Sequence, residues 1–340
     1  MKKSGLGENR TRKALFAVCV TLALGSLAAT DAAAAAPDRK PAAKRKTLKQ
    51  EPVRKAKAAK RPEARQPAAR SDAAESDNLM LKSTAVVVQD QSTGEVLFEK
   101  NPDAVLPIAS ITKLMTAMVV LDAQLPLDEI LAIGEEDVDT LKGTRSHLRV
   151  GSRLSRENLL LLALMASENR AAAALSRHYP GGREAFIGAM NHKAAAIGLK
   201  DTRFHDATGL TAANVSSARD LTKMVAAASR YPLIRELSTT GERILEVDGR
   251  GLAFHNTNLL VRSQTPGWEI AVSKTGYIRE AGKCLVMQAW LNQRPVVIVL
   301  LDSWGRLTRI GDANRIKRWI ESASAGASRP SAALGRGNAG

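Results

Sequence analysis

The chain has 340 residues, with 50 basic against 34 acidic side chains and a formal net charge of +16. Residues 1–36 contribute +3 of this charge and residues 37–70 contribute +10, so the rest of the chain is nearly neutral. A nucleic-acid-binding protein is expected to carry its basic charge on a folded face, with aromatic side chains where single strands bind. The sequence shows neither feature, and we therefore expect no nucleic-acid partner.

Residues 1–36 have the pattern of a secretory signal peptide. Five basic residues precede an apolar stretch at 14–29, and the alanines at 32–36 offer a cleavage site. The apolar stretch is too short and too rich in alanine to favour a stable membrane span, so we expect export. After cleavage only Cys284 remains, which excludes an internal disulfide and predicts a small buried apolar side chain.

Residues 37–80 are rich in alanine, proline and lysine and contain few large apolar side chains. Thirteen basic and three acidic residues lie within 37–70. Such a segment buries too little surface to offset the entropy lost on ordering, so we expect a disordered tether. Its charge favours contact with an anionic wall or membrane surface, and a plain soluble spacer is the alternative.

Residues 81–322 are expected to form one domain with strands at both ends and helices in the middle. The strand patterns lie at 85–88, 95–99, 270–273, 285–291 and 296–301. The helix patterns begin at Ser155, Arg183 and Ser217, and a closing helix covers 310–320. This arrangement predicts two lobes with a cleft between them, followed by a loose polar tail at 323–340.

Ser110 and Lys113 stand three residues apart at the start of an apolar run at 114–121. Residues at this spacing share one face of a helix, so the amine of Lys113 can reach the Ser110 hydroxyl. A neutral amine beside a serine can take its proton during attack on a carbonyl. The pair therefore predicts an activated nucleophile, although S-x-x-K alone is a common pattern.

Two further triplets follow in an informative order. Ser167-Glu168-Asn169 comes directly after a leucine-rich run, and Lys274-Thr275-Gly276 is expected at the end of a strand. Each has an ordinary explanation by itself, since a second S-x-N occurs at Ser76-Asp77-Asn78. The three motifs together, in this order, are typical of penicillin-recognising serine enzymes.

With these motifs the chain resembles the low-molecular-mass penicillin-binding proteins, most closely the D-alanyl-D-alanine endopeptidase branch of the serine D-Ala-D-Ala peptidases. The resemblance covers roughly residues 81–322 and includes the runs Pro107–Met115, Met165–Ala172, Ala207–Leu210, His255–Asn258 and Lys274–Tyr277. It implies an α/β (α+β) fold of the β-lactamase/transpeptidase type. Such a fold has a five-stranded antiparallel sheet flanked by helices, an all-helical lobe, and the active site in the cleft between them.

The resemblance also implies a periplasmic or cell-wall location, peptidoglycan stem peptides as substrates, β-lactams as covalent inhibitors, and no cofactor. Relatives with a second β-rich domain and a C-terminal amphipathic anchor continue further. Because this chain ends in Ala-, Ser- and Gly-rich sequence, we do not expect anchoring by that route.

For the catalytic residues we expect Ser110 to attack the carbonyl between two D-configured centres, with Lys113 as general base. Burial and a second ammonium, that of Lys274, are expected to lower the pKa of Lys113. Ser167 is expected to pass a proton to the leaving amine. Asn169 is expected to hold the substrate amide or Lys113.

For substrate binding we expect Lys274 and Thr275 to hold the carboxylate beside the scissile bond, within a site completed by Gly276 and Tyr277. By resemblance, the backbone N–H groups of Ser110 and Tyr277 form the oxyanion hole.

Four other classes of protein could share some of these sequence features. A carboxypeptidase would differ from an endopeptidase only in the leaving amine, which the motifs do not distinguish. A β-lactamase would share all three motifs, but no convincing loop with a glutamate for deacylation lies between Asn169 and Lys274. A metallopeptidase needs clustered ligands, and the five histidines show no such spacing, so no metal is expected. A non-catalytic wall-binding module would not need three intact motifs.

Overall fold

The structure, a computed structural model, describes residues 79–327, with side chains described through residue 323. The predicted signal peptide, nearly all of the predicted tether and the end of the predicted tail lie outside the described residues. At the start of the described part, Leu79 and Leu81 are both buried against the sheet domain. No helix within residues 79–327 is long and apolar enough to cross a bilayer.

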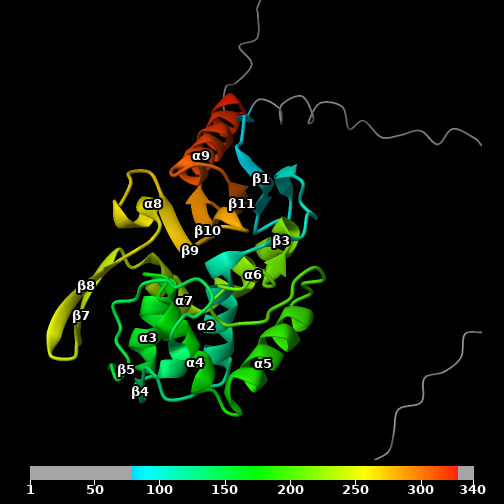
Figure 1. Cartoon of the computed structure of the whole chain (residues 1–340). Coiled ribbons are helices and arrows are strands. Elements are labelled where there is room, and N and C mark those ends of the chain that lie inside the picture. The colour runs from blue at the N-terminus through cyan, green and yellow to red at the C-terminus, as the bar shows by residue number, and fades with distance from the viewer. Residues whose placement is uncertain (1–78, 328–340) are drawn as a thin grey trace, which may run out of the picture. The chain divides into compact units, whose positions relative to one another are not determined.

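A five-stranded antiparallel sheet forms one lobe (Figure 1). Its strands, in spatial order, are β2 (Val96–Lys100), β1 (Ser83–Asp90), β11 (Arg294–Ser303), β10 (Gly282–Leu291) and β9 (Glu269–Ile278). β1 pairs with β11, so the first strand of the domain lies beside the last. The predicted sheet and both predicted hairpins are confirmed.

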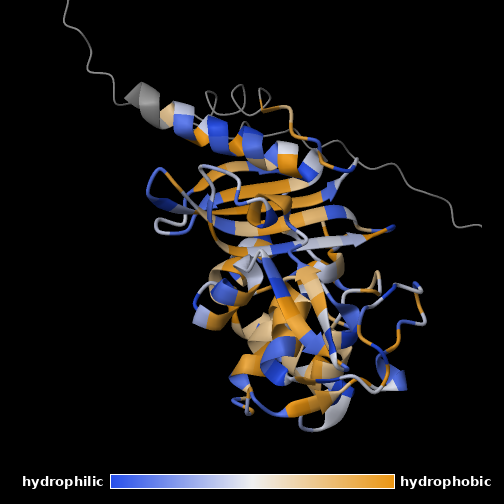
Figure 2. Cartoon of the chain, turned by 90° about the vertical axis from the view of Figure 1, so that its left-hand side faces the viewer, coloured by the Kyte–Doolittle hydropathy of each residue, from blue (hydrophilic) through white to orange (hydrophobic). Residues whose placement is uncertain are grey.

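The sheet is buried on both faces, and alternate residues of its strands enter two different cores. On β10, Cys284 and Val286 face the helical lobe, whereas Leu285 and Met287 face α9 (Thr308–Ala327). Figure 2 shows the apolar strands between α9 on one side and the helical lobe on the other. This two-sided burial explains why these strands have continuous apolar runs in the sequence.

The helical lobe is built around α2 (Thr112–Asp122), which is buried from Thr112 to Val120. An apolar surface on all sides is expected of a helix at the centre of a lobe. The surrounding helices are α3 (Arg156–Leu164), α4 (Asn169–Arg177), α5 (Gly182–Ala196), α6 (Ala218–Ala228) and α7 (Pro232–Thr239). Ser155 and Ser217 cap α3 and α6 through their side chains, as predicted from the sequence.

Several short elements complete the fold. Two-residue β3 (Leu106–Pro107) pairs with β6 (Val215–Ser216), and β4 (Ile130–Ala132) pairs with β5 (Arg153–Ser155). The 3-10 turns η2 (Ala109–Ile111) and η3 (Glu135–Asp137) and the short helix α8 (Leu259–Arg262) complete the path.

The sequence interpretation missed the hairpin of β7 (Glu242–Val247) and β8 (Arg250–His255), which projects from the domain (Figure 1). Most of its side chains are at least partly exposed, so its sequence lacks the alternation that marks a half-buried strand.

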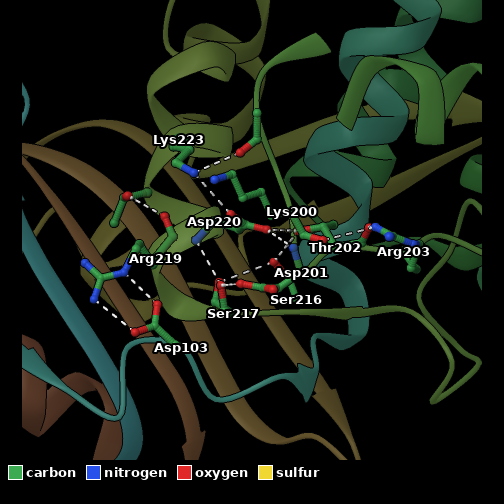
Figure 3. A network of polar contacts seen from close by, with 12 residues as sticks. Asp103, Lys200, Asp201, Thr202, Arg203, Ser216, Ser217, Arg219, Asp220 and Lys223 are labelled. Atoms are coloured by element: carbon green, nitrogen blue, oxygen red, sulfur yellow. Dashed lines mark hydrogen bonds and ion pairs between the residues drawn. The ribbon is translucent and has the colours of Figure 1, made fainter. Parts of the chain in front are cut away.

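The segment between α5 and α6 is anchored at both ends by Asp220. Its carboxylate accepts hydrogen bonds from the backbone N–H of Asp201 at 2.7 Å and the Thr202 hydroxyl at 3.0 Å (Figure 3). The Ser217 hydroxyl in turn accepts from the Asp220 N–H. The residues in between are held against α2 by Lys113 and Thr116, which donate to the carbonyl oxygens of Thr208 and Ala207.

Candidate active site

Ser110 lies in η2, in the turn that leads directly into α2. Its Oγ is 3.0 Å from the Nζ of Lys113, which is the contact that the sequence spacing predicts. The serine belongs to a tight 3-10 turn rather than to the α-helix itself. The apolar run in the sequence predicted the helix but not this turn.

Lys113 is completely buried and its amine donates three hydrogen bonds. Besides Ser110, the acceptors are Asn169 Oδ1 at 2.7 Å and the carbonyl oxygen of Thr208 at 2.7 Å. Burial lowers the pKa of Lys113 to about 8, although the carboxylates of Asp206 and Glu168 favour its charged form. A useful fraction of this amine is therefore neutral near physiological pH.

Lys274 was expected to lower the pKa of Lys113, but in the structure the effect is on the pKa of Lys274 instead. Burial is the main cause that lowers the pKa of Lys274, and the charges of Lys113 and Arg309 lower it further, to well below its ordinary value. Coupling between the two lysines thus disfavours the charge on Lys274. The pKa of Lys113 is lowered by its burial.

Ser167 lies between α3 and α4 and Asn169 is the first residue of α4, directly after the leucine-rich helix as the sequence predicts. Asn169 begins α4 and contacts Lys113, whereas Ser167 has a φ of 60°, a left-handed conformation that is uncommon for serine. Within the described residues the Ser167 hydroxyl has no hydrogen-bond partner. The structure therefore brings Ser110, Lys113 and Asn169 into direct contact and leaves the Ser167 hydroxyl available.

Lys274, Thr275 and Gly276 lie inside β9, which continues to Ile278, so the expectation that they end a strand was wrong. The triplet lies on an edge strand. The Lys274 amine donates to the Thr275 carbonyl at 3.0 Å, and the Thr275 hydroxyl donates to Thr257 Oγ1 at 2.6 Å. The centre of the exposed Tyr277 ring lies 4.1 Å from the Lys283 amine.

Two glycines allow other parts of the backbone to approach the nucleophile turn closely. A Cβ at Gly209, where φ is +79°, would lie 1.9 Å from the Ala109 carbonyl oxygen. A Cβ at Gly276 would lie 2.8 Å from the Ile108 carbonyl oxygen and 3.3 Å from the Ser110 nitrogen. The turn that carries Ser110 is therefore held between a loop of the helical lobe and the edge strand of the sheet.

Sequence reasoning assigned no role to two residues at this site. The Thr208 carbonyl accepts from Lys113, and a backbone contact of this kind has no side-chain signature. Arg309, on α9, donates to the carbonyl oxygens of Gly276 at 3.2 Å and Cys284 at 3.3 Å. Arg309 thus places a positive charge near Lys274. The sequence did not predict this contact, because Arg309 is far from the Lys274 triplet along the chain.

The remaining candidate groups fit no second catalytic centre. Burial raises the pKa of the Cys284 thiol to about 11, which makes this cysteine a poor nucleophile at neutral pH. Among residues 79–323, no group of three or more His, Cys, Asp or Glu side chains is placed to hold a metal ion.

Comparison with known families agrees with this geometry. The family model for D-alanyl-D-alanine carboxypeptidase, peptidase S11, matches residues 71–304. The chain belongs to this family. It is therefore a serine peptidase of the low-molecular-mass penicillin-binding protein class, as the motifs predict.

Two curated relatives within the family are named D-alanyl-D-alanine endopeptidase. The protein from Pseudomonas aeruginosa is 52% identical over 243 residues, which cover 71% of this chain and 78% of the relative. The protein from Escherichia coli is 49% identical over 243 residues, with the same coverage. More distant relatives, such as one from Bacillus subtilis at 31% identity, are named D-alanyl-D-alanine carboxypeptidase.

Solved structures confirm the predicted fold class. The Streptomyces K15 DD-transpeptidase superposes with a TM-score of 0.66 at 29% identity, covering 72% of this chain and 98% of that one. Penicillin-binding protein D2 from Listeria monocytogenes, in a cefotaxime-bound form, gives a TM-score of 0.62 at 28% identity, covering 71% and 98%.

Proposed function

We propose that this peptidase is a D-alanyl-D-alanine endopeptidase, which cleaves D-Ala–diaminopimelate cross-links in peptidoglycan through an acyl-enzyme on Ser110. The observation that carries this proposal is the buried Lys113 amine, 3.0 Å from Ser110 Oγ, with its pKa lowered to about 8. The endopeptidase names of the relatives at 52% and 49% identity favour the cross-link over a terminal D-alanine as the substrate.

In the acylation step, the neutral Lys113 amine takes the Ser110 proton while Oγ attacks the D-alanine carbonyl carbon. The tetrahedral intermediate then expels the amine of the neighbouring stem peptide, which leaves with a proton. The Ser167 hydroxyl, which has no partner among residues 79–323, is suited to pass on that proton, and the contact between Asn169 and Lys113 keeps the base in place. The backbone N–H groups of Ser110 and Tyr277 are assigned to the developing oxyanion.

The Lys274 amine is assigned to the substrate carboxylate beside the scissile bond, with the Thr275 hydroxyl as a second donor. Because its pKa is well below the ordinary value and cations surround it, an incoming carboxylate restores the stability of its charged form. Hydrolysis of the ester by water then regenerates Ser110.

The proposed location is the periplasm, where the cross-linked wall is accessible. The basic residues at 37–70 are proposed to add electrostatic attraction to anionic wall polymers or membrane headgroups.

The proposal is tested with purified cross-linked muropeptide dimers and with pentapeptide monomers, each incubated with the protein and with its Ser110→Ala variant. We expect the dimer to be cleaved to monomers by the wild-type protein alone. Faster release of D-alanine from the pentapeptide would instead assign the chain as a carboxypeptidase.

β-Lactams test the same nucleophile and separate a penicillin-binding protein from a β-lactamase. Their strained amide and carboxylate imitate the D-Ala-D-Ala terminus, so Ser110 should open the ring and retain the product. Intact-mass spectrometry should show one stoichiometric adduct on the peptide that contains Ser110. Free hydrolysed drug accumulating many-fold over enzyme would indicate a β-lactamase.

A further inference from the structure

The loop between η3 and β5, residues 138–152, reaches from the helical lobe to the sheet lobe beside the active site. Lys142 on this loop forms an ion pair of 2.6 Å with Glu280, in the turn that follows β9. Two residues further on, the hydroxyl of Thr144 accepts a hydrogen bond from Asn169 Nδ2 at 3.0 Å. The loop therefore contacts a residue that touches the catalytic lysine.

Thr144 also connects Asn169 to a carboxylate. Its hydroxyl donates to Asp139 Oδ2 at 2.7 Å. Together with the bonds of Lys113 to Asn169 and to Ser110, this forms an unbroken series of side chains from Asp139 to the nucleophile.

Asp139 is well placed to remain ionised. Its burial opposes the charge, but hydrogen bonds from the Lys142 N–H, the Thr144 hydroxyl and N–H, and the Leu141 N–H hold the pKa of this carboxyl below its ordinary value. The three N–H bonds measure between 2.8 and 3.0 Å. An ionised carboxylate can only accept hydrogen bonds, so it fixes the direction of the Thr144 hydroxyl.

The direction of the Thr144 hydroxyl determines the orientation of the Asn169 side-chain amide. Because the Thr144 proton points to Asp139, its oxygen can only accept from Asn169, which must present its NH₂ group there. The carbonyl oxygen of Asn169 is thereby turned toward Lys113. With the amide reversed, an NH₂ group would face the Lys113 amine, and the accepting contact would be lost.

We infer that Asp139 and Thr144 are positioning residues, which fix the amide orientation of Asn169 and so hold the Lys113 amine against Ser110. The inference rests on the proposed function, because it takes Lys113 as the base. Both residues act through Asn169 and contact neither Ser110 nor Lys113.

Loss of this control should alter the proton affinity of Lys113 as well as the rate. The other charged groups around Lys113 are Glu168 before α4, Asp206 in the segment before β6, and Lys274 on β9, which Arg309 adjoins. These groups are retained in every variant below. Without the Asn169 acceptor the charged form of Lys113 is less stable, so its pKa should fall further.

The test compares Thr144→Val, which keeps the shape but removes the hydroxyl, with Thr144→Ser, which restores it. Thr140→Val on the same loop is the matched control, since the structure shows no side-chain hydrogen bond for Thr140. The measurement is the second-order rate constant for acylation by a fluorescent penicillin, over the pH range in which Lys113 titrates. We expect Thr144→Val to lower the plateau about tenfold and to move the midpoint down by roughly half a pH unit.

Thr144→Ser should stay near the wild-type plateau and midpoint, and Thr140→Val should match wild type. If Thr144→Val does not fold, as judged by thermal melting, Asp139→Ala replaces it, because alanine has no acceptor for the Thr144 proton. A wild-type profile in the folded variant, or a lower plateau with an unmoved midpoint, would overturn the inference.

Ser110→Ala separates the two proposals. If this variant is still acylated, the proposed nucleophile is wrong. If it is inert while Thr144→Val behaves as wild type, only the role of Asp139 and Thr144 fails.

Discussion

Lys113 on α2 and Lys274 on β9 are both buried at the same site, but their surroundings differ in charge. Lys113 donates to three oxygen acceptors and lies near two carboxylates. Lys274 donates to one carbonyl oxygen and lies near two cations, Lys113 and Arg309. The surroundings of Lys113 stabilise its charged form when it takes a proton during catalysis. The surroundings of Lys274 lack a negative charge until an anion binds. Two lysines of equal burial are thus suited to different tasks.

The largest expected effect comes from removing the base or its partner. Ser110→Ala and Lys113→Ala should each lower turnover by a factor of roughly a thousand or more, almost as far as the double variant, because the two groups act as a unit. Hydrolysis of muropeptides by the three purified variants measures this. A tenth of wild-type activity in either single variant would refute the assignment.

A smaller effect is expected at the anion-binding lysine. Lys274→Met should lower the acylation rate by a carboxylate-bearing penicillin roughly a hundredfold, the loss expected for a charged hydrogen bond. The methyl ester of the same penicillin is the matched control, since it has no anion for Lys274 to bind. An equal loss with acid and ester would show that Lys274 serves another purpose.

The pH profile distinguishes the two lysines more finely. Since the folded pKa of Lys113 is about 8, below its ordinary 10.5, the neutral base accumulates as pH rises through 8. Acylation should therefore increase about tenfold per pH unit below the midpoint and level off above it. Because burial, and not the charge of Lys274, lowers the pKa of Lys113, Lys274→Met should leave the midpoint unmoved. A midpoint that moved in this variant would show that the charge of Lys274 does contribute to the lowered pKa of Lys113.

The smallest effect concerns the basic residues at 37–70. A protein that begins at Asn78 should hydrolyse small muropeptides at the wild-type rate but lose salt-sensitive retention on anionic walls. Beginning at Leu81 should also lower the melting temperature, because it removes Leu79, which is 6% exposed. If the protein that begins at Asn78 is retained as well as the full chain at low salt, residues 37–70 have no electrostatic role in retention.

The parts of this site that the sequence predicted are those with side-chain patterns. Periodicity and motif predicted the spacing of Ser110 and Lys113, the position of Asn169 directly after the leucine-rich helix, and the strands on both sides of the helical insertion. The Thr208 carbonyl contact did not, because any residue supplies a carbonyl. Asp139 and Thr144 were missed because a threonine and an aspartate in a polar loop look like any turn.

The close approach at Gly209 and Gly276 has a thermodynamic consequence. Where two backbones meet the Ile108–Ser110 turn without intervening side chains, main-chain packing fixes the Ser110 backbone. The position of the attacking Oγ then depends on a single side-chain torsion and on its contact with Lys113. The entropy of ordering the nucleophile is then lost once, when the chain folds, and not again with each substrate. A methyl group at Gly209 would therefore slow the reaction by displacing the turn that carries Ser110, although every reacting group would remain chemically intact.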